Sequence, residues 1–260
     1  MQPHIIEVAD GFWNIRGSFK IGGIIEIGTQ ASLIRRSNGR FVFLDSYALS
    51  GDVERRVLEL TNGGKDVEAI LNVHPFHTVY ARKMQERFPD ARFYGTARHL
   101  SRFPELRWEA QRTEDPELHT MFADDFDFSV PLGVDFISSN ENVHFSSVLA
   151  LHRASKSIHV DDTLMYIRFP KAARLLGRTD SMRFHPTLGK ALQKRAGAAQ
   201  DFRQWAEGLA ERWRDAKNLC AAHSAALTAA KNRGASIHDR MLDALTKANR
   251  TLKAHESKHG

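Results

Sequence analysis

The sequence predicts an α/β sandwich, and two observations lead to this prediction. Between residues 41 and 95 a strand pattern, a helix pattern and a strand pattern alternate, which is typical of an α/β layer rather than of separate α and β parts. Further short strand patterns return between residues 122 and 160, and a long stretch rich in Ala, Leu, Lys and Arg follows residue 169. We therefore expect sheets in the first part of the chain and a helical C-terminal extension.

Length and composition are those of a globular protein. The chain has 260 residues, 42% of them hydrophobic and 26% charged, with a net charge of +6. We expect a single domain over residues 1–260, in which residues 170–260 are mainly helical. The one cysteine, Cys220, excludes an intramolecular disulfide and a cysteine-based zinc module. No apolar run is long enough to span a bilayer, so we expect a cytoplasmic protein with no membrane partner.

The first half of the chain contains the clearest local signals. Residues 11–16 alternate as a strand does, and residues 32–36 and 40–44 form a predicted hairpin across Ser37, Asn38 and Gly39. The Asn-Gly pair favours a tight primed turn, which needs positive φ angles. The elements expected next are a helix over 51–60, a buried strand over 67–73, a helix over 79–88 and a strand over 91–95.

The second half is predicted with fewer signals. Residues 100–121 look irregular, and strands are expected over 126–130, 134–138, 148–152 and 157–160. A helix with Phe202, Trp205, Leu209 and Trp213 on one face then follows, and a weaker helical pattern covers residues 241–252. We interpret that aromatic face as core. Periodicity alone does not distinguish such a face from the contact of a homodimer.

Several ligand-type residues flank the predicted strands. A metal site without cysteine needs neutral imidazoles and a carboxylate that converge from strand ends, a donor set that zinc, iron and manganese accept. Five residues have this placement: His74, His77, His144, Asp162 and His223. Because strand ends on one edge of an α/β layer form its natural cleft, these residues are the candidate site. Asp45 is interpreted as a strand-end cap or a partner of a histidine, and His99, His152 and His159 as packing residues.

The order of these segments resembles the metallo-β-lactamase fold superfamily of metal-dependent hydrolases. Residues 41–46 resemble its strand that ends in Asp, and residues 69–77 resemble the strand that leads into its HxHxDH motif. Residues 142–148, 161–164 and 222–224 resemble its later His, Asp and closing His segments. The resemblance covers residues 5–225 and implies a four-layer αββα sandwich.

The HxHxDH motif is degenerate in this chain. With His77 on its last His, His74 matches the second His, but Asn72 and Phe76 replace the first His and the Asp. A register with His74 as the first His loses both later ligands. In the preferred register the resemblance implies two metal positions. One would be held by His74, His144 and Asp162, and the other by His77, His223 and the shared Asp162.

The function that the resemblance implies is metal-dependent hydrolysis. Water activated by one or two divalent ions, zinc first, would attack an ester, amide, thioester or phosphoester, with Asp162 as the catalytic residue that bridges or orients it. Two alternatives remain open: a non-catalytic relative that has lost its metal and binds a small ligand or partner, and a two-metal redox enzyme. Phosphate-binding glycine motifs are missing from the sequence, which argues against a nucleotide-binding fold. The basic patches lack interleaved aromatic residues, so we expect no nucleic-acid partner. The partner that the resemblance implies is a small-molecule substrate.

Overall fold

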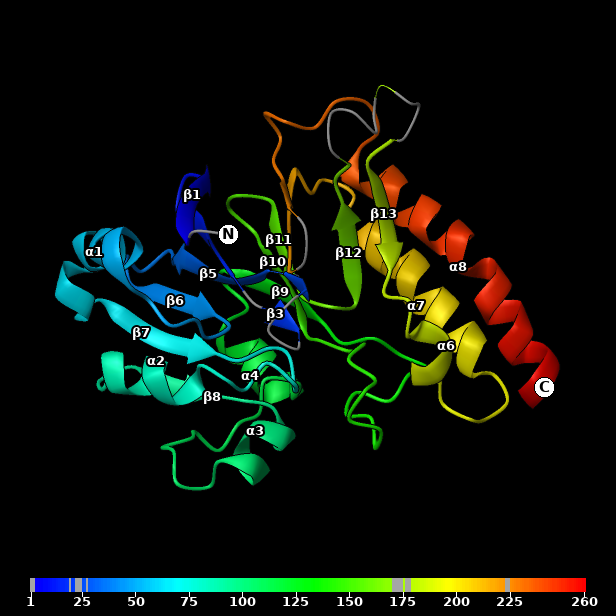
Figure 1. Ribbon diagram of the computed structural model, residues 1–260, viewed down its shortest axis with the longest axis horizontal. Helices are drawn as coiled ribbons and strands as arrows, with labels where there is room; N and C mark the ends of the chain where they lie inside the picture. The colour runs from blue at the N-terminus through cyan, green and yellow to red at the C-terminus, as the bar shows by residue number, and fades with distance from the viewer. Residues whose placement is uncertain are drawn as a thin grey trace. The chain divides into compact units, whose positions relative to one another are not determined.

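The structure is a computed structural model that describes residues 3–18, 20–21, 25–26, 28–169, 175, 179–222 and 225–260 (Figure 1). The chain forms two compact units. The first consists of Met1–Phe128 and Ala150–His159, and the second of Ser129–Leu149 and Val160–Gly260. No helix among the described residues is both long enough and apolar enough to cross a bilayer.

A six-stranded sheet in the order β1-β2-β5-β6-β7-β8 is the base of the first unit. Its strands are β1 (His4–Ala9), β2 (Phe12–Gly17), β5 (Thr29–Arg35), β6 (Phe41–Leu44), β7 (Val67–Leu71) and β8 (Arg92–Tyr94). The strands from β1 to β6 pair antiparallel, whereas β7 pairs in parallel with both β6 and β8. Parallel neighbours need crossover connections, which α1 (Gly51–Leu60) and α2 (Ala81–Arg87) supply. The short strands β3 (Lys20–Ile21) and β4 (Ile25–Glu26) pair separately.

The predicted hairpin is confirmed as β5 and β6, but the tight primed turn is wrong. The Arg36 amide donates to the Arg40 carbonyl at 2.8 Å, which leaves residues 37–39 as a three-residue loop. Within this loop Gly39 has a positive φ of 83° and Asn38 does not. The Ser37 amide donates to the Asp125 carboxylate at 2.7 Å, so a tertiary contact fixes the loop. A three-residue loop that ends in a left-handed glycine is the next most common hairpin connection.

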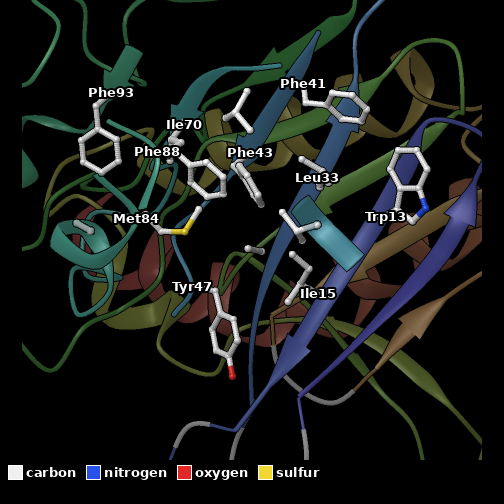
Figure 2. Packing of buried hydrophobic residues seen from close by; sticks show 14 of the residues in the cluster. Trp13, Ile15, Leu33, Phe41, Phe43, Tyr47, Ile70, Met84, Phe88 and Phe93 are labelled. Atoms are coloured by element: carbon white, nitrogen blue, oxygen red, sulfur yellow. The ribbon is translucent and has the colours of Figure 1, made fainter. Parts of the chain in front are cut away.

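One face of this sheet carries a hydrophobic core (Figure 2). Alternate residues of β2, β5 and β6, such as Ile15, Leu33 and Phe43, point to this face because side chains alternate along a strand. The helices cover it through Val57 of α1 and Met84 of α2, each of which lies on the apolar side of its helix. The predicted helices over 51–60 and 79–88 are confirmed as α1 and α2.

The opposite face of the sheet packs on a second sheet. Within the first unit its strands are β9 (Phe126–Ser129), β10 (Leu149–His152) and β11 (Ser157–Val160), of which β10 and β11 pair antiparallel. The Phe12 and His152 rings lie 6.0 Å apart, and Ser32 Oγ lies 2.9 Å from His159 Nδ1. His152 and His159 are therefore buried residues of strand faces, as predicted.

Two helices lie in the segment expected to be irregular, where that expectation is wrong in part. Helix α3 (Ala97–Arg102) begins after Thr96, whose side chain forms a reciprocal capping box with His99. Helix α4 (Pro116–Met121) has its proline in the first turn, where the missing amide hydrogen costs nothing. A short 3-10 helix, η1 (Asn62–Gly64), also follows α1. Helices this short have too few residues for their hydrophobic period to show in the sequence.

The second unit combines helices with strand pairs. Strands β12 (Leu164–Ile167) and β13 (Ser181–Phe184) pair antiparallel, as do β14 (Asn218–Ala221) and β15 (Ala226–Leu227). The helices are α6 (Leu188–Ala191), α7 (Ala198–Arg212) and α8 (Ile237–His259), and α8 packs on both α7 and β13. Strands β13, β14 and β15 thus lie inside the region expected to be mainly helical. They were missed because each is only two to four residues long.

The aromatic face of α7 is core, as predicted. Phe202 lies 5.0 Å from Phe184 and 5.3 Å from Trp205 between ring centroids, and all the predicted face residues are buried. The Trp205 indole donates to Ser129 Oγ at 2.9 Å. Other residues of the same chain therefore fill this face.

The strand expected over 134–138 does not form. Val134 makes one isolated bridge with Leu192, after which the chain turns away. The preceding Gly133 has a φ of 72°, and a Cβ built on it would lie 2.0 Å from the Ala198 carbonyl oxygen. The close approach of this loop to the first turn of α7 therefore requires glycine and replaces continued pairing.

We predict that the buried His152 makes the protein sensitive to acid. Desolvation lowers the pKa of His152 to about 4, so the folded state keeps this ring neutral while an unfolded chain protonates it near pH 6.5. Its contribution to stability is therefore complete above about pH 6.5 and is lost as pH falls toward about 4. The free energy of unfolding should lose about 2 kcal/mol from this residue between about pH 7 and about pH 5. Urea unfolding at both pH values should show a smaller loss for His152→Gln, and equal losses in the two proteins would contradict the prediction.

Candidate functional site

The candidate site lies at one edge of the first sheet. Strands β6, β7 and β8 run parallel, so their C-terminal ends meet at the same edge. Asp45 and Ser46 follow β6, residues 72–77 follow β7, and residues 95–96 lead from β8 into α3. The loops after parallel strands are the usual place for functional side chains in α/β proteins.

Asp45 ties the ends of β6 and β7 together. Its backbone amide donates to the Leu71 carbonyl at 2.8 Å, and its Oδ1 accepts a hydrogen bond from the Val73 amide at 2.8 Å. The residue is 1% exposed and has a φ of 63°, a left-handed conformation that aspartate tolerates better than most residues. The prediction of a strand-end cap is therefore confirmed.

The second oxygen of Asp45 orients His77. Oδ2 lies 3.2 Å from His77 Nδ1. Because an ionised carboxylate only accepts hydrogen bonds, Nδ1 carries the proton and the ring lone pair is at Nε2. The His77 side chain is 23% exposed, so the ring is reachable from solvent. A histidine held in this way by a carboxylate has the tautomer and the orientation of a metal ligand.

His74 stacks on His77 but is held differently. The two ring centroids lie 4.0 Å apart with an angle of 22° between the planes. His74 Nδ1 accepts a hydrogen bond from the Phe76 amide at 3.1 Å, which places the proton of the neutral ring on Nε2. For a metal to bind His74 through either nitrogen, this contact would have to break or the proton would have to move.

Asn72 is committed to the structure of the sheet edge. Its Oδ1 accepts from the Ser46 hydroxyl at 2.6 Å, and its Nδ2 donates to the Tyr94 carbonyl at 2.9 Å. The Thr113 hydroxyl donates to the Asn72 carbonyl at 2.8 Å. The side chain is fully buried. Asn72 therefore joins the ends of β6, β7 and β8 at the position where the resemblance implies a metal-binding histidine.

Phe76 packs on a cation from α3. The Arg98 guanidinium carbon lies 4.4 Å from the centre of the Phe76 ring, and the ring centroid lies 6.1 Å from that of His74. A guanidinium at this distance makes a favourable cation–π contact. Nothing in the local sequence predicts this pair, because the two residues are brought together only by the packing of α3.

His99 holds the backbone of His77 through a hydrogen bond. Its Nδ1 accepts from the Thr96 hydroxyl at 2.9 Å, and its Nε2 donates to the His77 carbonyl at 3.4 Å. Complete burial lowers the pKa of His99 to about 3, and the nearby His74 and His77 act in the same direction. The ring is therefore neutral at physiological pH, and it acts as a packing residue, as predicted.

The second unit contains the predicted acidic segment. Asp161 and Asp162 follow β11 and are both buried. The next residue, Thr163, donates its hydroxyl to the Phe145 carbonyl and accepts from the Ser147 amide, each at 2.9 Å. These two hydrogen bonds fix the backbone of the aspartate pair.

The two remaining predicted histidine ligands are His144 and His223. His144 is half-buried, and its Nε2 donates to the Glu141 carbonyl at 2.7 Å, so its lone pair is at Nδ1. His223 lies outside the described residues.

In the described part of the chain, each of the two units contains side chains of the kind that bind a divalent metal. These are Asp45, His74 and His77 in the first unit and Asp161 and Asp162 in the second. His77 and the aspartates are residue types that bind such an ion, and His77 has its ring lone pair on Nε2. His74 fits after a change of hydrogen bonding, whereas Asn72 and Phe76 do not fit.

Comparison with solved structures identifies the fold. The DIM-1 metallo-β-lactamase, in crystals exposed to ceftazidime, matches with a TM-score of 0.59 and 12% identity, over 95% of this chain and 98% of that chain. A metallo-β-lactamase from Erythrobacter litoralis, with β-mercaptoethanol in its active site, matches with a TM-score of 0.59 and 13% identity, over 95% and 97%. The FIM-1 metallo-β-lactamase from Pseudomonas aeruginosa, in its mono-zinc form, matches with a TM-score of 0.55 and 11% identity, over 95% and 96%.

The chain therefore has the metallo-β-lactamase fold, which confirms the predicted α/β sandwich of this type with its helical C-terminal extension. No protein-family model and no curated protein sequence matches the chain. At these identities the similarity establishes the fold alone.

We predict that Asn72 stabilises the protein. The Asn72→Ala variant leaves the buried Ser46 hydroxyl without its acceptor and should lower the free energy of unfolding by about 2 kcal/mol. The exposed Asn142, changed to Ala as a control, should lower it by less than about 0.5 kcal/mol. Chemical unfolding of the two variants and the parent measures both values. Equal stability of Asn72→Ala and the parent would show that these buried hydrogen bonds contribute nothing.

Proposed function

We propose that the protein is a metal-dependent hydrolase. It would use one divalent metal ion, for which zinc is the first candidate, to hydrolyse an ester, amide, thioester or phosphoester of a small molecule. The observation that carries this proposal is the Asp45–His77 pair at the end of the parallel strands. A buried carboxylate that fixes the tautomer of a solvent-reachable histidine is the arrangement that metal-binding histidines use.

The proposed ligands are His74, His77 and Asp162. His144 and His223 are further ligands that the fold family implies at the later strand ends. Asn72 and Phe76 remove two donors, so the proposed load is one ion rather than two. The mono-zinc form of FIM-1 is in keeping with a single ion on this fold. Three protein ligands and an open position are sufficient for a catalytic zinc site.

The residues of the chain have distinct roles in this proposal. A bound divalent ion would supply the acidity that ionises water near neutral pH. Asp45 keeps the Nδ1 proton of His77 in place, so that the ring lone pair is on Nε2. Asp162, a buried carboxylate on a backbone fixed by Thr163, would orient the attacking water. His99, neutral and hydrogen-bonded to the His77 carbonyl, keeps the loop in position without adding charge.

A second candidate function is non-catalytic binding of a small ligand or partner. The Asn72 side chain is satisfied by Ser46 and Tyr94, and His74 Nδ1 already accepts from the Phe76 amide. In this alternative the histidine pair belongs to a stable loop that has no resident metal. The substrate of either candidate depends on loops that the fold does not specify.

Metal affinity of an Asp45→Asn variant tests the proposal. Asparagine retains an oxygen for the Val73 amide and tolerates the left-handed backbone, but it loses the charge that fixes His77. We expect protein purified without chelator to bind about one equivalent of zinc and the variant to bind it about 10- to 100-fold more weakly, as measured by calorimetric titration.

The matched control is Asp10→Asn, which changes a 91% exposed aspartate in the same way and should leave zinc affinity unchanged. Near-zero metal in the parent protein, unchanged after zinc, iron or manganese is added back, would favour the non-catalytic alternative. Equal zinc affinity in the parent and in a folded Asp45→Asn variant would remove the observation on which the proposal depends.

We also predict that Phe76→Asp raises the affinity for metal or the number of ions bound. The substitution adds a carboxylate beside His77, where the fold family places a metal-binding aspartate. Loss of the contact with Arg98 should lower stability by about 1 kcal/mol. Phe76→Asn, which has the size of Asp without its charge, is the control and should not strengthen binding. Unchanged zinc stoichiometry and affinity in a folded Phe76→Asp protein would show that the motif register is wrong or that one ligand cannot restore the second position.

A further inference from the structure

The second unit contains a large cavity that is lined by none of the candidate metal-site residues. Its volume is about 860 Å³, within the range of cavities that bind small molecules. Three segments line it: the loop over residues 135–143, α6 with the residues that follow it, and the C-terminal half of α8. All three belong to the second unit, so the cavity is complete within it.

The lining is strongly basic. Lys190, Lys194, Arg250 and Lys258 are exposed around the cavity, and Asp135 is the one carboxylate among the residues that line it. In the described part of the chain none of the four cations forms an ion pair or a side-chain hydrogen bond. Other arginines among the described residues do form ion pairs. Arg36, for example, pairs with Glu68 and Asp125 at 2.8 Å each.

The cations on α8 are spread along one side of the helix. Arg250, Ala254 and Lys258 follow one another at four-residue spacing, so they share a face, and the small Ala254 leaves space between the two charges. Eight residues correspond to about 12 Å along a helix, which is longer than one phosphate group. A ligand that meets both charges must therefore carry more than one anionic group or be extended.

Hydrogen bonds hold the three walls together. The Asp135 amide donates to the Ala191 carbonyl at 2.9 Å, and the Gln193 amide donates to the Gly133 carbonyl at 3.0 Å, which joins the loop to the segment after α6. His255 Nε2 donates to the Gln193 carbonyl at 2.9 Å, which joins that segment to α8. The backbone segments that carry the cations are thus joined by hydrogen bonds, which limits the conformational entropy that the protein loses when a ligand binds.

The surroundings of His259 are consistent with a positive potential. Desolvation lowers the pKa of His259, and His255, Lys258 and Lys194 lower it further by charge repulsion. Neutral donors are available as well, because Ser138 and Thr251 line the cavity with hydroxyl groups. Hydroxyl donors combined with Lys and Arg are the groups that bind phosphate oxygens.

We propose that this cavity binds a small molecule with several phosphate groups, of the class of inorganic polyphosphates and nucleoside polyphosphates. A nucleic-acid strand would need exposed aromatic rings on which its bases could stack. The exposed large apolar residues among those described are Val79, Met121, Leu132, Ile137 and Leu175, none of them aromatic. A monocarboxylate would meet only one of the four cations. The proposal does not depend on the metal site, since it involves none of those residues.

Titration of inorganic tripolyphosphate into the metal-free full-length protein at physiological salt tests the proposal. We expect saturable calorimetric binding to the parent protein, and an affinity at least about tenfold lower for the double variant Lys194→Glu, Lys258→Glu. The matched control is the double variant Lys231→Glu, Lys253→Glu. It makes the same change of net charge in the second unit with exposed lysines that do not line the cavity, and its affinity should stay within about threefold of the parent.

A nucleoside triphosphate should compete with tripolyphosphate, and tighter binding of the nucleoside form would identify the base as an additional contact. Three results would overturn the proposal. The first is the absence of saturable binding up to about 1 mM. The second is an equal loss of affinity in the control variant, which would mean attraction by net charge alone. The third is a single-stranded oligonucleotide that displaces tripolyphosphate and binds more tightly, which would assign the cavity to nucleic acid.

Discussion

The buried carboxylate of Asp45 is the contact on which the sheet edge depends. Parallel pairing brings the ends of β6, β7 and β8 to one edge, where each chain must turn away and its backbone amides lose their ladder partners. Asp45 accepts the Val73 amide with one oxygen and orients His77 with the other. A left-handed backbone costs a non-glycine residue about 1 to 2 kcal/mol, and a hydrogen bond to a charged group, worth about 1.5 to 3 kcal/mol, offsets that cost.

The same edge shows how structural and chemical uses compete for one position. Asn72 bonds Ser46 after β6 and the Tyr94 carbonyl at the end of β8, so its amide links three strands. An imidazole has one donor and one acceptor when neutral, and it could not make both bonds and also bind a metal. The amide therefore stabilises the edge with groups that a metal ligand would have to leave unused. Asn72 thus serves the sheet edge at the position where the resemblance implies a metal-binding histidine.

The sequence predicts those features that depend on nearby residues. The β5–β6 hairpin, α1, α2, β7 and β8 were predicted because their apolar periods are expressed within one element. Asp45 was correctly assigned as a cap because it follows a buried strand directly. The hairpin turn was mispredicted because Asp125, 88 residues away, holds the Ser37 amide. Helices α3 and α4 were missed because each has only six residues.

In the candidate site, too, the features that depend on nearby residues could be predicted and those that depend on distant partners could not. The segments that carry His74, His77 and Asp162 could be chosen from their places after strands. The hydrogen bonds that set each imidazole tautomer could not be predicted, because the sequence does not show which partner each ring nitrogen bonds. The role of Asn72 was likewise hidden, since its partners Ser46 and Tyr94 lie 26 and 22 residues away. Tertiary partners thus decide the chemistry of residues whose positions are already predictable.

The net charge of the chain does not show which cations are paired. The total of +6 predicts a solvated basic surface, because composition cannot distinguish paired from unpaired cations. In the first unit Arg36, Arg87 and Arg92 neutralise Glu54, Glu68 and Asp125, so their charges are largely cancelled where they lie. In the second unit four cations line one cavity against a single carboxylate. Salt screens their mutual repulsion over about 8 Å at physiological ionic strength, so the fold can carry this cluster at small cost. Part of the excess charge therefore lies on a concave surface, where it is available for binding.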